Sequence, residues 1–121
     1  MIDHLYWYVD ERLTIPVLDF VKALTKKERA KIKAYIQELK LQGYNLRRPM
    51  ADYIGQGIYE LRPKDNRVFY FFYLRNNIVF VHVIRKKADQ ILGNDIQICL
   101  KRKKIVEELG TNITEIKGDD L

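Results

Sequence analysis

Apolar residues near the start of the chain recur at the spacing of a helix. A short aromatic run, Tyr6–Val9, first favours a β-strand. Pro16 then suits the first turn of a helix. The apolar positions that follow lie at i, i+3, i+4 and i+7, which is one helical face: Val17, Phe20, Val21 and Leu24.

A second helix is predicted immediately afterwards. Thr25 and Glu28 form a capping box at its start, and Gly43 is a typical C-terminal stop. Its apolar stripe consists of Ile32, Tyr35, Ile36 and Leu39. Because almost no loop separates the two helices, we expect them to form an antiparallel hairpin.

The composition then changes to that of a β-sheet. Three runs rich in β-branched and aromatic residues are separated by turn formers at 63–66 and 76–77, and they are Ile58–Arg62, Arg67–Leu74 and Ile78–Arg85. Short turns between consecutive strands predict an antiparallel meander. Both faces of the middle strands are apolar, so we expect the helical hairpin to cover one face and part of the C-terminal segment the other.

These elements predict an α+β fold, with an N-terminal helical hairpin packed on a small antiparallel sheet and a C-terminal helix. Asn94 with Gln97 marks the start of that last helix, which is expected to end near Gly110. No repeat or linker divides the chain. We therefore predict one domain over residues 1–110 and a polar, loosely held tail over residues 111–121.

Charge is concentrated in the middle of the chain. The net charge is +6, and residues 25–48 alone hold eight basic and two acidic residues, while residues 49–87 hold seven and three. Such a cationic field attracts polyanions, of which nucleic acid is the commonest, but charge alone does not establish this, and a solvated surface is the simpler explanation. A single cysteine, Cys99, indicates a reducing cytoplasm, and no apolar run approaches the ~18 residues of a membrane span.

The chemistry-bearing residues exclude several enzyme classes. His4, His82 and Cys99 have no partners at metal-ligand spacing, so no metal site is expected. Gly55-Gln56-Gly57 lacks the rest of a phosphate-cradling motif. The chain contains no serine, which excludes a serine nucleophile.

What remains is a set of ionic side chains on the predicted sheet. Glu60 and Arg62 share one strand face because they are two residues apart, and Arg67 begins the next strand. The third strand ends in Arg85, Lys86 and Lys87. Cations of this kind stabilise a pentacovalent phosphorane, and RNA carries its own nucleophile, the 2′-OH. Salt bridges and a solvated strand end are the equally simple structural alternatives.

The same segments resemble a known family. Gly57-Ile58-Tyr59-Glu60-Leu61-Arg62, Arg67-Val68-Phe69-Tyr70-Phe71-Phe72 and Val81-His82-Val83-Ile84-Arg85-Lys86-Lys87 are similar to the phage-derived Gp49-like/HigB branch of the RelE/ParE toxin superfamily. The resemblance implies a RelE-like fold and metal-independent, ribosome-dependent cleavage of mRNA, with no cofactor. It also implies a neighbouring HigA-like helix-turn-helix antitoxin as partner.

By motif position, the resemblance implies that Arg62 and Arg67 hold the scissile phosphate and that Glu60 or Lys87 takes part in proton transfer. Further phosphate contacts are expected from the remaining basic residues of the motifs and from the basic helix, namely Lys86, Arg85, Lys64, Lys26 and Lys27.

The chain also departs from the family pattern. Many relatives place a Tyr or His near the C-terminus for proton transfer, whereas here none follows His82. Tyr53, Tyr59 and His82 are the candidates to replace it, and spacing does not choose among them. Two other functions therefore stay open, a ParE-like inhibitor of DNA gyrase and a nucleic-acid-binding module without catalysis.

Overall fold

The computed structural model describes residues 1–86 and 93–121. Its strands are β1 (His4–Tyr8), β2 (Ala51–Gly55), β3 (Ile58–Leu61), β4 (Asn66–Tyr73), β5 (Asn77–Arg85) and β6 (Ile113–Glu115). Within those residues the α-helices are α1 (Pro16–Lys22), α2 (Lys26–Gln42) and α3 (Gly93–Leu109). Lys87, one of the expected catalytic residues, lies outside the described residues.

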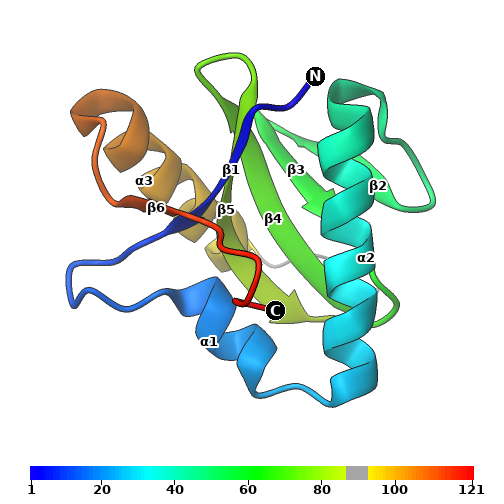
Figure 1. Cartoon of the computed structure of the whole chain (residues 1–121). Helices are drawn as coiled ribbons and strands as arrows, with labels where there is room; N and C mark the ends of the chain where they lie inside the picture. Colours follow the sequence, from blue (N-terminus) through cyan, green and yellow to red (C-terminus); the bar gives the residue numbers. More distant parts are fainter. Residues whose placement is uncertain (87–92) are drawn as a thin grey trace.

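The strands form one six-stranded, mostly antiparallel sheet in the order β2-β3-β4-β5-β1-β6 (Figure 1). The predicted meander is confirmed as β3-β4-β5. The sheet is wider than expected, because β2 pairs antiparallel with β3 and β1 lies parallel to β5. The α+β class is therefore confirmed, with a sheet about twice as wide as the meander alone.

The local signals that delimit α2 act as predicted. The Thr25 hydroxyl accepts a hydrogen bond from the backbone N–H of Glu28 at 3.2 Å, which satisfies one free donor of the first turn. Gly43 ends the helix at φ +53, a conformation that disfavours residues with a Cβ. A Cβ there would also lie 3.3 Å from the Ile2 side chain.

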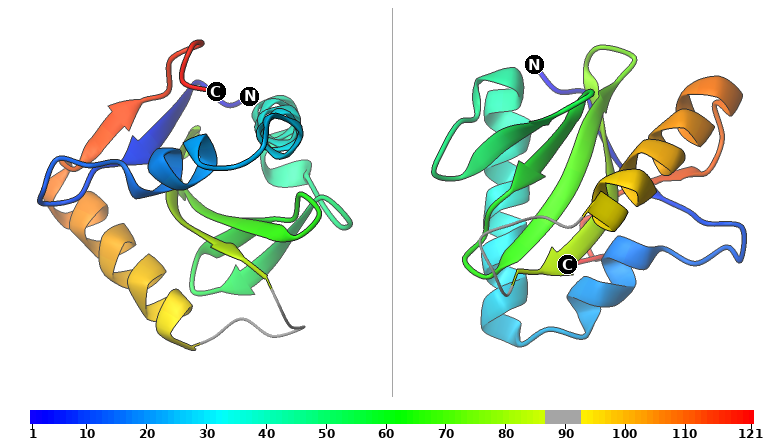
Figure 2. Two further views of the ribbon diagram at one scale, coloured as in Figure 1. Left: turned by 90° about the horizontal axis from the view of Figure 1, so that it is seen from below. Right: turned by 180° about the vertical axis from the view of Figure 1, so that it is seen from behind.

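Each face of the sheet has its own apolar core. On one face, Val17 and Val21 of α1 and Ile32 and Leu39 of α2 pack against the sheet around Trp7. On the other face, Cys99 and Val106 of α3 pack against alternate residues of the same strands, including Phe69, Phe71, Val79 and Val81. The expectation that the C-terminal segment covers the second face is confirmed, and α3 is the part that does so (Figure 2).

The helices α1 and α2 do not lie side by side as the expected antiparallel hairpin would. They meet at a wide angle and follow different parts of the sheet (Figures 1 and 2). The seven residues of α1 bury Val17, Leu18 and Val21, and this short helix packs against β1 and β5. The apolar faces of both helices are thus used against the sheet, which leaves little for a helix–helix contact.

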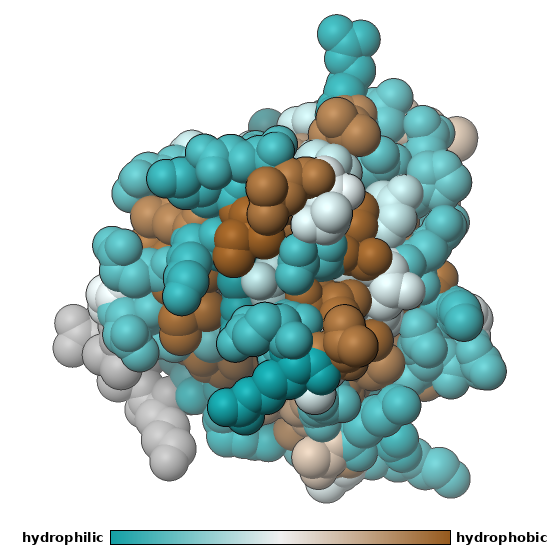
Figure 3. Space-filling view, turned by 90° about the vertical axis from the view of Figure 1, so that its left-hand side faces the viewer, coloured by the Kyte–Doolittle hydropathy of each residue, from teal (hydrophilic) through white to brown (hydrophobic). Residues whose placement is uncertain are grey.

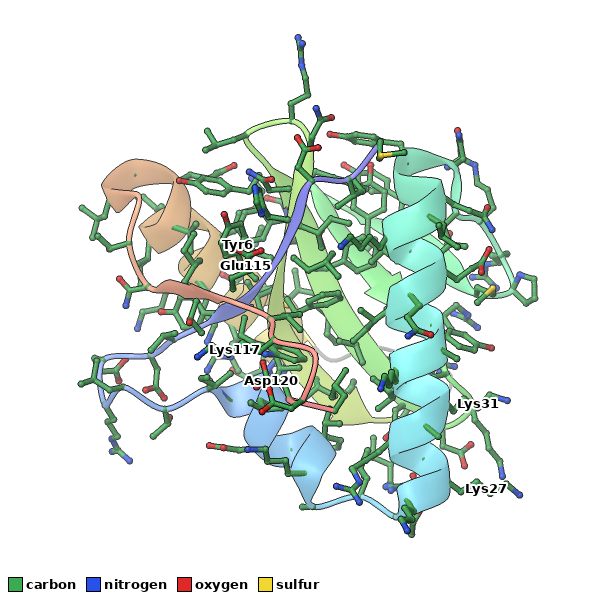
Figure 4. All side chains as sticks on the ribbon, viewed as in Figure 1. Tyr6, Lys27, Lys31, Glu115, Lys117 and Asp120 are labelled. Atoms are coloured by element: carbon green, nitrogen blue, oxygen red, sulfur yellow. The ribbon has the colours of Figure 1, made fainter. Side chains whose placement is uncertain are left out.

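Residues 111–121 are not the loose tail that their polarity suggested. Ile113–Glu115 forms β6 along the open edge of β1, and Ile116 donates its backbone N–H to the carbonyl of Leu5 at 2.9 Å. Asp120 then accepts hydrogen bonds from the indole N–H of Trp7 at 2.9 Å and from the backbone N–H of Lys117 at 2.8 Å. The end of the chain is therefore attached to a core residue near the labelled Lys117 and Asp120 (Figure 4).

Apolar side chains do not form one continuous surface on the side of the molecule that carries α3, β6 and the β1–α1 loop. They appear there as separate patches among polar residues (Figure 3). Among the described residues, no helix is both long and apolar enough to span a bilayer.

The Trp7–Asp120 hydrogen bond predicts a measurable contribution to stability. Trp7 is fully buried, so Asp120→Ala leaves its indole donor without a partner and lowers the free energy of unfolding by about 1–3 kcal/mol. Urea unfolding measures the loss. Asp119→Ala, at the exposed neighbouring position, is the control and changes stability by less than about 0.5 kcal/mol. Equal stability of both variants would show that the C-terminal segment is held by β6 alone.

Candidate active site

A buried carboxylate lies at the end of β3 between two arginines. Glu60 is 2% exposed, and its Oε2 accepts a hydrogen bond from Nη1 of Arg62 at 2.7 Å. Its Oε1 lies 3.8 Å from Nε of Arg67, which begins the neighbouring strand β4. The sequence prediction that Glu60 and Arg62 share a face and that Arg67 lies close to them is confirmed. We call Glu60, Arg62 and Arg67 the ionic trio.

The turn between β3 and β4 fixes the guanidinium of Arg67. Its Nη1 donates to the carbonyl oxygens of Lys64 and Asn66, both at 2.8 Å. Burial, with the nearby charge of Arg62, lowers the pKa of Arg67 below its ordinary value. A guanidinium has so high an ordinary pKa that Arg67 still carries its charge at neutral pH.

The three members differ in their access to solvent. The Arg62 side chain is 19% exposed, against 9% for Arg67 and 2% for Glu60. With two guanidiniums and one carboxylate, the trio carries one net positive charge, and Arg62 is the member that presents it to solvent. Such an arrangement is suited to an anion, because the guanidinium fork matches the oxygens of a phosphate.

His82 lies on the same sheet face as the trio, although not in contact with it. Glu60, Phe69 and His82 are paired across three neighbouring strands, so roughly 10 Å of sheet separates the backbones of Glu60 and His82. The fully buried ring of Phe69 lies between them and stacks on the imidazole, with ring centroids 5.7 Å apart.

The second partner of His82 comes from α3. Its Nε2 lies 2.9 Å from Oδ1 of Asp95, in the first turn of α3. Burial lowers the pKa of His82 and outweighs the opposing effect of Asp95. The imidazole is therefore neutral at pH 7 and links β5 to α3.

Tyr53 and Tyr59, the other two candidates for proton transfer, lie on the opposite face of the sheet. They pair with each other across β2 and β3, and Tyr59 stacks on Tyr70 in the core that α1 and α2 cover. Neither hydroxyl reaches the trio. Of the three proposed substitutes, only His82 is on the face of the trio.

The basic residues at the end of β5, in the β3–β4 turn and at the start of α2 are not all gathered at the trio. Arg85 points to the face of α2, where its Nη2 donates to Glu28 at 2.8 Å. Lys86 continues from β5, and its backbone N–H donates to the carbonyl of Asp65 at 2.7 Å, which brings it beside the β3–β4 turn. Lys64 and Lys27 line a separate pocket, and Lys26 begins α2 nearby. The expected single cluster is thus divided between the two faces.

The sequence analysis did not anticipate two residues that organise this region. Asp95 lies in the first turn of α3, and no local sequence pattern indicates that this turn contacts β5. Arg102 donates to the carbonyl of Val81 at 2.6 Å, at the point where a register shift interrupts the β4–β5 pairing. An irregularity of this kind frees a strand carbonyl, and sequence alone does not locate it.

The fold and the trio together define a small α+β protein with a cationic site suited to a phosphate group. The sequence model of the family described as "Phage derived protein Gp49-like" matches residues 19–104, and the chain belongs to this RelE-like, toxin-like family. No curated protein matches the chain significantly. Within residues 1–86 and 93–121, no three His, Cys, Asp or Glu side chains come together as metal ligands.

The lowered pKa of His82 predicts a pH dependence of stability. The unfolded chain binds a proton near pH 6.5 that the folded chain binds only at lower pH, so stability is complete above that value and falls as the pH decreases below it. Urea unfolding at pH 7.5 and at pH 5.5 measures the decrease. We expect His82→Gln to reduce this decrease, whereas His4→Gln, at an exposed position, controls for the other histidine. An unchanged decrease in His82→Gln would assign the pH dependence to other groups.

Proposed function

We propose that the chain is a HigB-type toxin of a toxin–antitoxin pair and cleaves mRNA on the ribosome through the 2′-OH of the RNA. The observation that carries this proposal is the ionic trio, in which two arginines surround a buried carboxylate and one of them reaches solvent. Membership of the Gp49-like family supports the toxin part of the proposal. The helix-turn-helix antitoxin, the ribosome and a cytoplasmic location are further parts of the same proposal.

In this proposal Arg62 contacts the scissile phosphate. Attack by the 2′-OH adds negative charge to the phosphorane, and a guanidinium already held in place stabilises that charge without reorganisation. Arg67 is less exposed, and two turn carbonyls and Glu60 hold it beside Arg62. It supplies a second, fixed positive charge behind the first.

Glu60 is a positioning residue in this mechanism. Its Oε2 accepts a hydrogen bond from Arg62 at 2.7 Å, and its Oε1 lies 3.8 Å from Nε of Arg67, so both carboxylate oxygens face guanidiniums. We therefore propose that Glu60 orients the two arginines and does not remove the proton of the 2′-OH. Glu60→Gln would keep the shape of the side chain and remove the charge that aligns Arg62.

The described residues supply charge stabilisation and leave the proton transfer to another group. His82 is two strands away across Phe69, and it is bonded to Asp95. The 2′-OH proton is therefore assigned to a group outside the described residues, either Lys87 or the ribosome. A site of this composition supports the proposal that cleavage requires the ribosome.

The proposal predicts that Arg62→Ala removes toxicity. Loss of one donor that stabilises the transition state lowers the cleavage rate by about 10²- to 10³-fold. After induction in growing cells, primer extension on mRNA should show codon-linked cuts for the wild type and none for Arg62→Ala. Because the substitution also removes the hydrogen bond to the buried Glu60, circular dichroism and binding to the antitoxin check that the variant is still folded.

The matched control is Arg12→Ala, which removes the same charge from an exposed loop between β1 and α1. It should arrest growth as the wild type does. Full toxicity of Arg62→Ala would remove the trio from the mechanism. Intact mRNA together with DNA damage after wild-type induction would instead support inhibition of gyrase.

A further inference from the structure

A second cationic site lies on the opposite side of the β3–β4 turn from the ionic trio. It is a pocket of about 660 Å³ between the start of α2 and the turn. Its lining includes four basic residues, Lys27, Lys31, Lys64 and Arg85, and two acidic residues, Glu28 and Asp65. Its volume lies within the range of small-ligand sites and is sufficient for a nucleotide.

The charges of this pocket are unequally compensated. Glu28 accepts hydrogen bonds from Arg85 at 2.8 Å, from Asn66 at 3.3 Å and from Thr25 at 3.2 Å, so its carboxylate is fully engaged. In the part of the chain that the structure describes, no carboxylate lies within 4.0 Å of the ammonium groups of Lys27, Lys31 and Lys64. Among residues 1–86 and 93–121, the pocket therefore offers three ammonium groups without an ion-pair partner, and an anionic ligand would supply one.

The geometry of α2 presents two of these ammonium groups together. Lys27 and Lys31 are four residues apart, so they are on one side of the helix. Figure 4 shows both side chains on the same side of α2, away from the C-terminal segment. Burial of Asn66, which is 2% exposed, and its bond to Glu28 fix the wall of the pocket behind them.

The pocket and the trio are joined by the turn itself. The carbonyls of Lys64 and Asn66 hold the guanidinium of Arg67 on the face of α3, while the same two residues line the pocket on the face of α2. A polyanion bound at Arg62 and continuing around the tip of this hairpin reaches the lysines of the pocket. This continuity favours an RNA strand over an isolated anion.

We propose that this pocket is a subsite for a nucleotide of the RNA strand, next to the phosphate that the trio holds. The phosphate of that nucleotide contacts Lys27, Lys31 and Lys64. The assignment rests on the proposed function for the identity of the polymer. The sequence predicts single phosphate contacts from Lys27 and Lys64, whereas the subsite defines a path for the RNA, from the face of α3 around the β3–β4 turn to α2.

The test compares two double variants that remove the same charge from the same helix. Lys27→Gln/Lys31→Gln alters the pocket, and Lys33→Gln/Lys40→Gln alters the side of α2 that faces the C-terminal segment. The probe is a fluorescent six-nucleotide 2′-O-methyl RNA, which has no free 2′-OH at which it could be cleaved. Fluorescence anisotropy of the full chain gives Kd as a function of salt concentration.

We expect the pocket variant to bind the RNA about tenfold more weakly at low salt. The slope of log Kd against log salt concentration should decrease by about 1.4, because each phosphate contact on a single strand contributes about 0.7 and two contacts are lost. The control variant should stay within about twofold of the wild type. In translating extracts, the pocket variant should need more protein for half-maximal mRNA cleavage while the maximal rate is unchanged.

Three outcomes would overturn the assignment of the pocket to RNA. Equal losses in both variants would show a diffuse cationic surface, and no loss in either would show that RNA does not occupy the pocket. A pocket variant that binds RNA normally but no longer binds the antitoxin would identify a protein interface. If the wild type cleaves no mRNA but its RNA binding still depends on the pocket, the subsite is retained and the endonuclease proposal is refuted. Failure of the subsite proposal can therefore be distinguished from failure of the endonuclease proposal.

Discussion

The structure around the proposed site depends on one buried charge, the carboxylate of Glu60. A carboxylate that is 2% exposed loses most of its hydration, and only charged or hydrogen-bonding partners compensate for that loss. Arg62 and Arg67 supply them from the two strands that the β3–β4 turn joins. The register of these strands, in which Glu60 faces Phe69, therefore determines where both guanidiniums lie.

Because of this constraint, the fold itself determines the position of the two guanidiniums. Glu60 orients Arg62, and the turn carbonyls orient Arg67. A substrate phosphate would then meet charges that need no rearrangement, which is the condition under which electrostatic stabilisation is most effective. The one net positive charge that remains is presented by Arg62, the most exposed of the three.

Much of this arrangement could be predicted from local patterns. The period of two residues in a strand placed Glu60 and Arg62 on one face, and the capping residues Thr25 and Gly43 delimited α2. The strands β2 and β6 were missed because neither has a marked apolar pattern. β2 ends at Gly55, with Gly57 two residues further on, and β6 has three residues, which pair with the open edge of β1. Such pairings are non-local, so they leave no signal in the sequence of either strand.

The position of the basic residues after β5 shows a second limit of local reasoning. Sequence adjacency suggested that Arg85, Lys86 and Lys87 act together, whereas strand alternation directs Arg85 toward α2 and Glu28. The register shift opposite Phe69 and Tyr70 adds an extra residue to β5, so alternation counted from the start of the strand gives the wrong face beyond it. His82 consequently faces α3 together with Val81, and its partner Asp95 could not be inferred from spacing.

The β3–β4 turn connects the ionic trio with the pocket, because its backbone atoms contact one and its side chains line the other. Its backbone carbonyls at Lys64 and Asn66 orient Arg67 on one face, and its side chains line the pocket on the other. Substitutions that keep the backbone of the turn can therefore change the pocket while the trio is preserved. A loop of this kind can vary the recognition of a substrate without altering the strands that hold the charges, which is how binding loops on rigid sheets generally diverge.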